Sequence, residues 1–179
     1  MTRRASQTTN SITLRAAGPS DAKALHTLIA SHLEEGHLLP RRLEELAVHA
    51  SRFVVAVRRR KVVGCAELAP LGGHLAEIRS LAVDRQARHQ KVGTQLVNEL
   101  QRRARLAGYE QLCVMTHAPE YFTNLGFSIV PHLWVPEKVF TDCVACPKFR
   151  TCGQFAMVLP LESPVETADR PLTIALHVA

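Results

Sequence analysis

Hydrophobic positions along this chain repeat with two periods, a short one typical of strands and a longer one typical of helices. The longer period predicts one helix from about Asp21 to Gly36 and another that ends at Gly108. Their apolar stripes are Leu25, Leu28, Ile29 and Leu33 in the first helix and Leu96, Val97, Leu100 and Ala104 in the second. Two shorter helices are expected, one that begins at Pro40 and one over residues 119–125.

The short period predicts strands separated by polar or glycine-containing turns. They are expected at residues 12–16, 53–57, 62–68, 75–83, 111–115, 128–135 and 154–161, with an irregular cysteine-rich stretch before the last. In chain order the elements read β-α-α-β-β-β-α-β-α-β-β, which indicates a single α/β domain. We expect this domain to span residues 11–161, between a flexible N-terminal tail at 1–10 and a C-terminal extension at 162–179.

Composition narrows the class of protein. A chain of 179 residues with 46% hydrophobic and 21% charged residues is typical of one soluble globular domain. It contains no apolar run of roughly 18–20 residues that could span a bilayer, and no secretory signal. Five cysteines, an odd number, do not fit a framework of disulfide bonds, so we expect a cytoplasmic protein. Because no apolar run is long enough, we expect no membrane partner.

The net charge of +6 raises the question of nucleic-acid binding. The basic residues are scattered, however, between a predicted turn at 58–61 and a helix at 102–105. The chain has only one Trp and two Tyr, too few for a platform that stacks bases. We therefore expect no nucleic-acid partner.

The most informative stretch is a strand at 76–83, a polar loop at 84–90 and a helix from Lys91 onward. A loop that opens directly into a helix directs free backbone N–H groups and the positive end of the helix dipole at one point. Gly93 allows a close approach of the backbone, and Arg88 brings further donors. This pattern predicts a pyrophosphate site, although an ordinary strand-to-helix connection has the same outline.

The same stretch resembles the acyl-CoA-binding motif of GNAT acetyltransferases, whose loop reads Gln/Arg-x-x-Gly-x-Gly/Ala. Arg88 and Gly93 match this pattern, and Lys91 stands where glycine is usual. The residues from Glu120 to Phe127 resemble the second signature of the family, a short helix that ends in Gly-Phe. The resemblance covers about residues 12–161 and implies the GNAT fold, an α/β fold with a mixed, mostly antiparallel sheet, splayed central strands and flanking helices.

Acetyl-CoA is the co-substrate that this resemblance implies, and the chemistry is direct attack of an amine on the thioester. The main chain of Leu81, Ala82 and Val83 would pair with the pantetheine arm. The pyrophosphate would be wrapped by Arg88, His89, Gln90, Lys91, Val92, Gly93 and Thr94.

Glu77, on the same strand, is the candidate general base, with a surface carboxylate as the alternative reading. The general acid is less evident. Many members of the family carry a Tyr four residues before the Gly of the second signature, and that position is Phe122 here. Tyr121 is adjacent in sequence, but neighbouring residues on a helix point about 100° apart. His117, near the end of a strand, is a weaker alternative base.

Residues 33–42 and 135–142 resemble segments of the acetyltransferase domain of N-acetylglutamate synthases. In those enzymes an Arg in the first segment binds a glutamate carboxylate, and Arg41 or Arg42 holds that position here. Arg79 could bind a second carboxylate. The closing strand departs from the family, because Gln154 and Ala156 replace an Arg and a Ser that contact the amino acid.

Cys143, Cys146 and Cys152 have the spacing of metal ligands, but a structural zinc usually takes four. A fourth ligand is not evident, so a reduced thiol cluster or a redox pair competes with zinc, and we predict no metal. Cys65 and Cys113 lie in strands and are expected in the core.

The sequence thus predicts a short, stand-alone enzyme that acetylates the amine of a small carboxylate-bearing molecule, L-glutamate first, for arginine biosynthesis. Another small amine or a protein N-terminus is the alternative acceptor. A CoA-binding sensor without activity is the alternative from another class, suggested by Lys91 and Phe122. A homodimer is compatible with this prediction.

Overall fold

The computed structural model describes residues 11–161, so the predicted tail at 1–10 and extension at 162–179 lie outside the described residues. The strands are β1 (Thr13–Ala16), β2 (Phe53–Arg58), β3 (Lys61–Pro70), β4 (Leu75–Val83), β5 (Gln111–Thr116), β6 (Ser128–Val130) and β7 (Phe155–Pro160). The helices are α1 (Ala22–Ala30), α2 (Leu43–Val48), α3 (Val92–Leu106), α4 (Pro119–Thr123) and α5 (Pro136–Lys138), with a π-helical turn at Val139–Cys143 directly after α5.

The strands form one sheet in the order β1-β2-β3-β4-β5-β7-β6. Within residues 11–161 the β4–β5 pair is parallel, with α3 as the crossover between the two strands, and the other pairs are antiparallel. The mixed, mostly antiparallel α/β sheet that the sequence predicts is confirmed.

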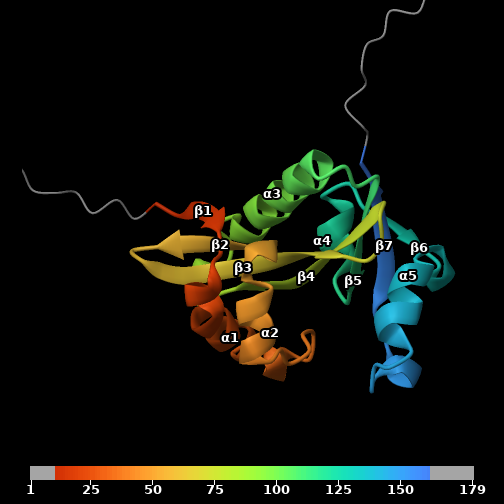
Figure 1. Cartoon of the computed structure of the whole chain (residues 1–179), viewed down its shortest axis with the longest axis horizontal. Coiled ribbons are helices and arrows are strands. Elements are labelled where there is room, and N and C mark those ends of the chain that lie inside the picture. Colours follow the sequence, from red (N-terminus) through yellow and green to blue (C-terminus); the bar gives the residue numbers. More distant parts are fainter. Residues whose placement is uncertain (1–10, 162–179) are drawn as a thin grey trace, which may run out of the picture.

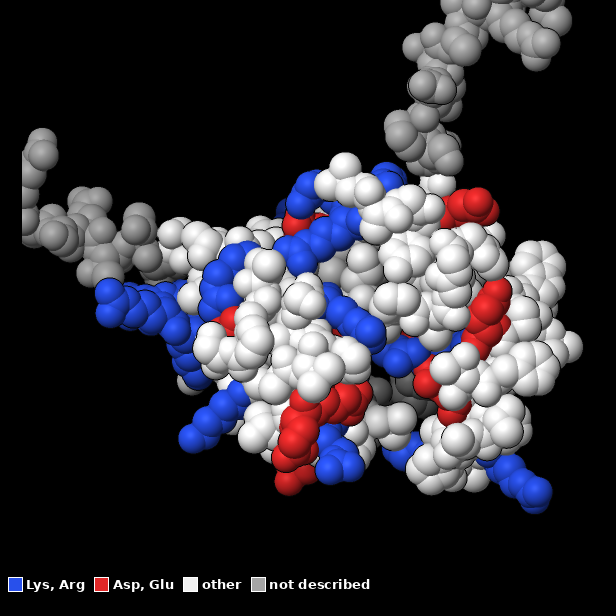
Figure 2. Space-filling model, in the orientation of Figure 1, with Lys and Arg blue, Asp and Glu red and all other residues white. Residues whose placement is uncertain are grey.

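Helices cover both faces of the sheet (Figure 1). One face packs against α3 and α4 in a core that includes Leu96, Leu100 and Phe127. The other face is covered in two places. Helices α1 and α2 lie over the half that contains β2 and β3, in a core with Leu25, Leu46, Phe53 and Val55. Val135, at the start of α5, packs with Leu75 and Cys113 in a smaller cluster over the other half. Figure 2 shows the surface hollowed between these two covers.

The parallel strands β4 and β5 pair over only part of their length. Leu75, Ala76 and Glu77 pair with Gln111, Leu112 and Cys113, and no pairing follows although both strands continue. The two central strands therefore separate beyond Glu77, which is the predicted splay. The backbone groups of β4 that face this gap are left free of partners in β5.

A bulge in β4 changes which side chains face which helix layer. The register shifts between Cys65 and Glu67 of β3, opposite Ser80, whose φ of 49° lies in the left-handed region. Before the bulge, Ile78 faces α3; after it, Leu81 packs on the α3 side and Ala82 joins the core under α1 and α2. A bulge inserts one residue and so reverses the strict alternation of a strand.

The first helix and the region after β6 differ from the prediction. Helix α1 ends at Ala30 rather than near Gly36, and a 3₁₀ turn at Leu33–Glu35 follows. The strand expected over 128–135 stops at Val130, because Pro131 lacks the N–H that a strand needs, and residues 132–143 are mostly helical. Among the described residues, no helix has the length and apolar character that crossing a bilayer requires.

Gly64 of β3 is required by its contact with α3. A Cβ atom there would lie 3.0 Å from Cγ1 of Val92 and 3.2 Å from Cδ1 of Leu96. We expect Gly64→Ala to lower the free energy of unfolding by about 1–3 kcal/mol through overpacking, measured by denaturant titration followed by circular dichroism. Gly73→Ala is the matched control, because a Cβ atom at Gly73 would meet no heavy atom within 4 Å apart from its chain neighbours. Equal stability of the two variants would contradict this packing argument.

Candidate functional site

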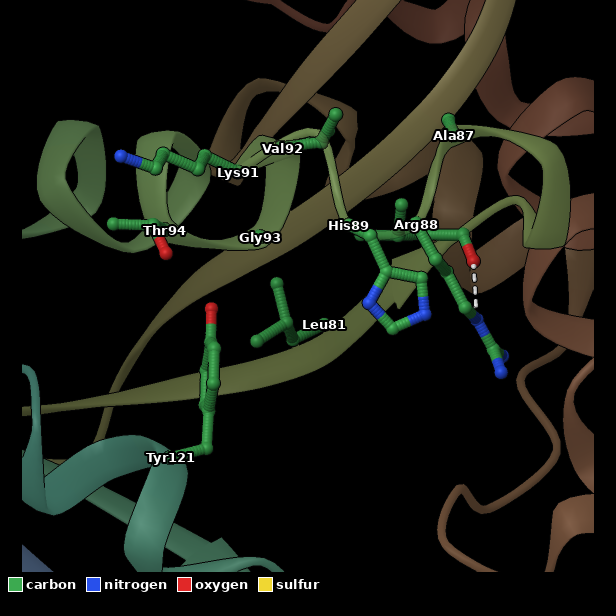
Figure 3. Close-up of a pocket in the computed structure, with 10 residues that line it drawn as sticks. Leu81, Ala87, Arg88, His89, Lys91, Val92, Gly93, Thr94 and Tyr121 are labelled. Atoms are coloured by element: carbon green, nitrogen blue, oxygen red, sulfur yellow. Dashed lines mark hydrogen bonds between the residues drawn. The ribbon is translucent and has the colours of Figure 1, made fainter.

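A cavity of about 370 Å³ opens at the N-terminus of α3, on the side of the sheet gap (Figure 3). Its walls come from the end of β4, the loop before α3, the first turn of α3, and α4. The residues that line it are Leu81, Val83, Ala87, Arg88, His89, Lys91, Val92, Gly93, Thr94 and Tyr121. Eight of the ten predicted cofactor residues are in this set; Ala82 and Gln90 are not. Ala82 belongs to the opposite core because of the bulge, and the Gln90 side chain bonds the Gln86 carbonyl.

The first turn of α3 faces this cavity with its backbone donors free of a side-chain cap. The residues before it turn sharply, since His89 and Lys91 have φ values of 62° and 59°. This explains why glycine is usual at the position of Lys91: the left-handed region is costly for other residues. Lys91 adopts that conformation, so its presence leaves the shape of the loop intact.

The Arg88 guanidinium lies against Glu35 rather than in the cavity. Its Nη2 atom is 2.8 and 2.9 Å from the two carboxylate oxygens of Glu35, and its Nε donates to the Val83 carbonyl at 3.3 Å. The Arg88 side chain points away from Tyr121 in Figure 3. Arg85 adds a longer contact to the same Glu35 carboxylate, at 3.3 Å. The loop therefore presents the backbone of Arg88 to the cavity, not the fork of donors that the sequence suggested.

Tyr121 and Phe122 have different surroundings. Phe122 is buried in the core with Phe127, whereas Tyr121 reaches from α4 toward the first turn of α3 (Figure 3). The Tyr121 hydroxyl is buried and forms no hydrogen bond within residues 11–161. Burial raises the pKa of this phenol. The neighbouring Thr94 side chain acts in the opposite direction, because a polar group nearby favours the charged form. The wall of the cavity therefore contains one buried donor that no group of the described residues satisfies.

On the opposite face of the sheet, Glu77 lies at the point where β4 and β5 separate. Its side chain is 4% exposed, and its carboxylate accepts hydrogen bonds from Lys138, at 2.9 Å, and from Arg79. Both cations also bond Asp142, which follows α5 in the π-helical turn. Burial opposes the charge of Lys138, yet the pKa of this amine is raised because Glu77 and Asp142 stabilise its charged form.

Arg41 and Arg79 are brought to neighbouring positions but have different partners. Arg41 donates to Glu67 at 2.8 Å and to Ser80 at 3.0 Å, and it also bonds Glu45. The Glu67 side chain is 1% exposed, so Arg41 neutralises a buried carboxylate. The Arg42 side chain is 85% exposed and forms a long ion pair, at 3.7 Å, with the exposed Glu44. Sequence reasoning missed Glu67, although a single carboxylate in the apolar run of β3 was a visible signal.

The other predicted candidates lie at the edges of this region. His117 is exposed and packs against His37, with ring centroids 5.2 Å apart and ring planes tilted by 46°. Within residues 11–161 no group of three His, Cys, Asp or Glu side chains could hold a metal ion, and the cysteines are free. Cys65 and Cys113 are fully buried, as predicted, and burial raises the pKa of the Cys65 thiol to about 12.

Residues 49–129 match the family described as "Acetyltransferase (GNAT) domain". A relative from Chlorobaculum tepidum, named "Uncharacterized N-acetyltransferase CT2212", is 32% identical over 148 residues, which make up 83% of this chain and 96% of that protein. An "Amino-acid acetyltransferase" from Pseudomonas aeruginosa is 34% identical over 116 residues. That match covers 64% of this chain and 27% of that protein, so the chain spans about a quarter of its length.

The fold is also similar to a solved structure, that of N-acetylglutamate synthase from Neisseria gonorrhoeae complexed with coenzyme A and N-acetyl-glutamate. The TM-score is 0.77 at 27% sequence identity, over 85% of this chain and 35% of that chain.

Arg41→Ala tests the pairing with Glu67. Removing the guanidinium leaves a buried carboxylate without its cation, so we expect a loss of about 3 kcal/mol in the free energy of unfolding. Denaturant titration measures this loss. Arg42→Ala is the matched control and should change stability by less than about 0.5 kcal/mol, as exposed ion pairs do. Adding Glu67→Gln to Arg41→Ala should restore part of the loss; a stable Arg41→Ala protein would refute the structural role of this pair.

Proposed function

Because the chain belongs to the GNAT family of acyl-CoA-dependent N-acetyltransferases, we propose that it acetylates the α-amine of L-glutamate with acetyl-CoA. The product, N-acetylglutamate, would serve arginine biosynthesis. The observation that carries this proposal is the juxtaposition of a buried carboxylate, Glu77, with two cations at the apex of the strand splay. The amino-acid acetyltransferase relatives and the similarity to an N-acetylglutamate synthase structure support the same substrate class.

The residues around the cavity suit the pyrophosphate and pantetheine of the co-substrate. The first turn of α3 offers uncapped N–H groups and the positive end of a 15-residue helix, which favour a phosphate group. The Tyr121 hydroxyl is a donor without a partner in the described residues. The unpaired edge of β4 beyond Glu77 offers backbone groups to an extended, amide-containing arm. We assign Leu81, Val83, Arg88, His89 and residues 91–94 to this role.

Acetyl-CoA supplies a thioester whose carbonyl carbon an amine can attack, with cleavage of the carbon–sulfur bond as the amide forms. The amine must first lose a proton, since an ammonium group has no free electron pair. We assign Glu77 to accept that proton, directly or through water, because it is the carboxylate closest to the end of the β4–β5 pairing. Arg79, next to Glu77, is assigned to hold a carboxylate of the substrate.

A thiol-release screen of acetyl-CoA against the twenty amino acids tests this function. The proposal expects fastest CoA release with L-glutamate and a product acetylated on the α-nitrogen, identified by mass spectrometry. Preference for a peptide N-terminus or for an amine without a carboxylate would replace glutamate with the alternative acceptor. Saturable binding of acetyl-CoA without release by any amine would instead indicate a CoA sensor.

Glu77→Gln tests the general base. We expect kcat to fall by about 10²–10⁴-fold, the usual contribution of a positioned base, while the Kd for CoA stays within about twofold. Thiol release measures the rate, and isothermal titration measures CoA binding. Glu110→Gln, a change at a residue outside the site that is not buried, is the control. A variant with the wild-type kcat would remove Glu77 from this role.

Gly93→Ala tests the cofactor cavity. A Cβ atom at Gly93 would lie 2.7 Å from the Tyr121 hydroxyl oxygen, so the Tyr121 side chain or the first turn of α3 must move. We expect CoA affinity to fall by about tenfold or more, because a small displacement of backbone donors costs affinity. Isothermal titration of CoA checks this. Adding Tyr121→Phe removes the clashing oxygen and should restore part of the affinity; no difference between Gly93→Ala and the double variant would contradict this explanation.

A further inference from the structure

The ion pairs around the candidate base form a closed ring with no net charge, made of Glu77, Arg79, Lys138 and Asp142. Glu77 and Asp142 each bond both Arg79 and Lys138, so that cations and carboxylates alternate around the ring. A single oxygen of Asp142, Oδ2, bridges the two cations; it lies 3.0 Å from Lys138 Nζ and also contacts Arg79 Nη2. The ring therefore contains a two-cation cradle that already holds one carboxylate oxygen.

The members of this ring differ in their access to solvent. Glu77 and Lys138 are the inner members, with side chains that are 4% and 13% exposed. Arg79 and Asp142 are the outer members, at 25% and 33%. Asp142 also belongs to a short π-helical turn, while Glu77 and Arg79 belong to a central strand. Asp142 is therefore the most exposed member of the ring, and it lies outside the central strand.

Resting on the proposed function, we infer that Arg79 and Lys138 together bind the α-carboxylate of the amino-acid substrate, and that Asp142 occupies this position in the free protein. A substrate carboxylate can replace the Asp142 carboxylate with its charge and its hydrogen bonds conserved. The exchange leaves both cations paired and frees Asp142 toward the solvent.

The position of the cradle selects the α-carboxylate. Lys138 Nζ is one hydrogen-bond length, 2.9 Å, from Glu77, the group assigned to take the proton of the amine. Only one carbon separates the amine from the α-carboxylate of an amino acid, so the two groups can reach Glu77 and the cradle together. Arg41 is less suited to this carboxylate, because Glu67, Glu45 and Ser80 already engage its guanidinium.

Acceptors without an α-carboxylate gain no binding energy from Arg79 and Lys138. A peptide N-terminus carries a neutral amide in that place, and an amide cannot compensate two cations released from Asp142. The ring is therefore a specificity device: a free α-amino acid opens it with no loss of ionic pairing, and a peptide does not.

Two substrates and two variants test this inference. L-Glutamate and its α-amide share the amine and the γ-carboxylate, and differ in the α-carboxylate alone. We expect Lys138→Met to raise the KM for L-glutamate by about 10–100-fold and to change the KM for the α-amide by less than about threefold. Lys148→Met, at an exposed lysine of the same segment, should leave both values unchanged. A purely structural role of Lys138 would affect both substrates equally and would overturn the inference.

Asp142→Asn should act in the opposite direction. It removes the competing carboxylate with little change in size, so the KM for L-glutamate should fall by about three- to tenfold. If Asp142 only supports the structure, the KM rises instead, and the inference fails. This second variant tests the inference even where Lys138→Met does not fold.

The inference and the proposed function fail in different ways. Absence of amino-acid acetylation by the wild-type protein would overturn the proposed function, and the inference with it. Acetylation of L-glutamate by the wild-type protein, with an unchanged preference over the α-amide in Lys138→Met, would overturn the inference alone.

Discussion

The bulge at Ser80 is the constraint on which both halves of the site depend. Strand β4 must turn Glu77 and Arg79 toward α5 and, a few residues later, Leu81 and Val83 toward the cavity at α3. Strict alternation would place all four on one face, because their spacing is even. The left-handed φ at Ser80 reverses the alternation between the two pairs. In the proposed function, one strand thereby serves the amine from one face and the cofactor from the other.

Buried charge is the second constraint on this region. Glu67 of β3 and Glu77 of β4 lie on the same face of the sheet, and both side chains are almost fully buried. A buried carboxylate is stable only with a close cation, and each has one from outside the sheet: Arg41 from the segment before α2, and Lys138 from α5. These pairs tie the two separate covers of this face to the strands between them. In the proposed function, Lys138 also serves the carboxylate of the substrate, whereas Arg41 is engaged by Glu67 and Glu45.

Local sequence was sufficient to predict most of the fold and most of the residues that line the cavity at α3. The apolar stripe of α3, the strand before it and Gly93 all lie within one short stretch, so their periodicity and glycine chemistry can be read directly. The sequence marked Lys91 only as a departure from the family pattern, and the structure shows that it adopts the left-handed conformation that glycine favours. The ends of α1 and β6 were less predictable, because Pro131 and the 3₁₀ turn at Leu33–Glu35 compete with the apolar pattern.

The sequence by itself determined the order of the elements and the loop that opens into α3. It also placed a carboxylate, Glu77, on the strand before that loop. Only the tertiary structure decided the partners of the charged side chains: Arg88 lies on Glu35, Arg41 on Glu67, and Lys138 on Glu77. The physical reason is the separation along the sequence over which each effect acts. Periodicity and turn chemistry act within a few residues, whereas these ion pairs join positions 26 to 61 residues apart, which meet only after the sheet has formed.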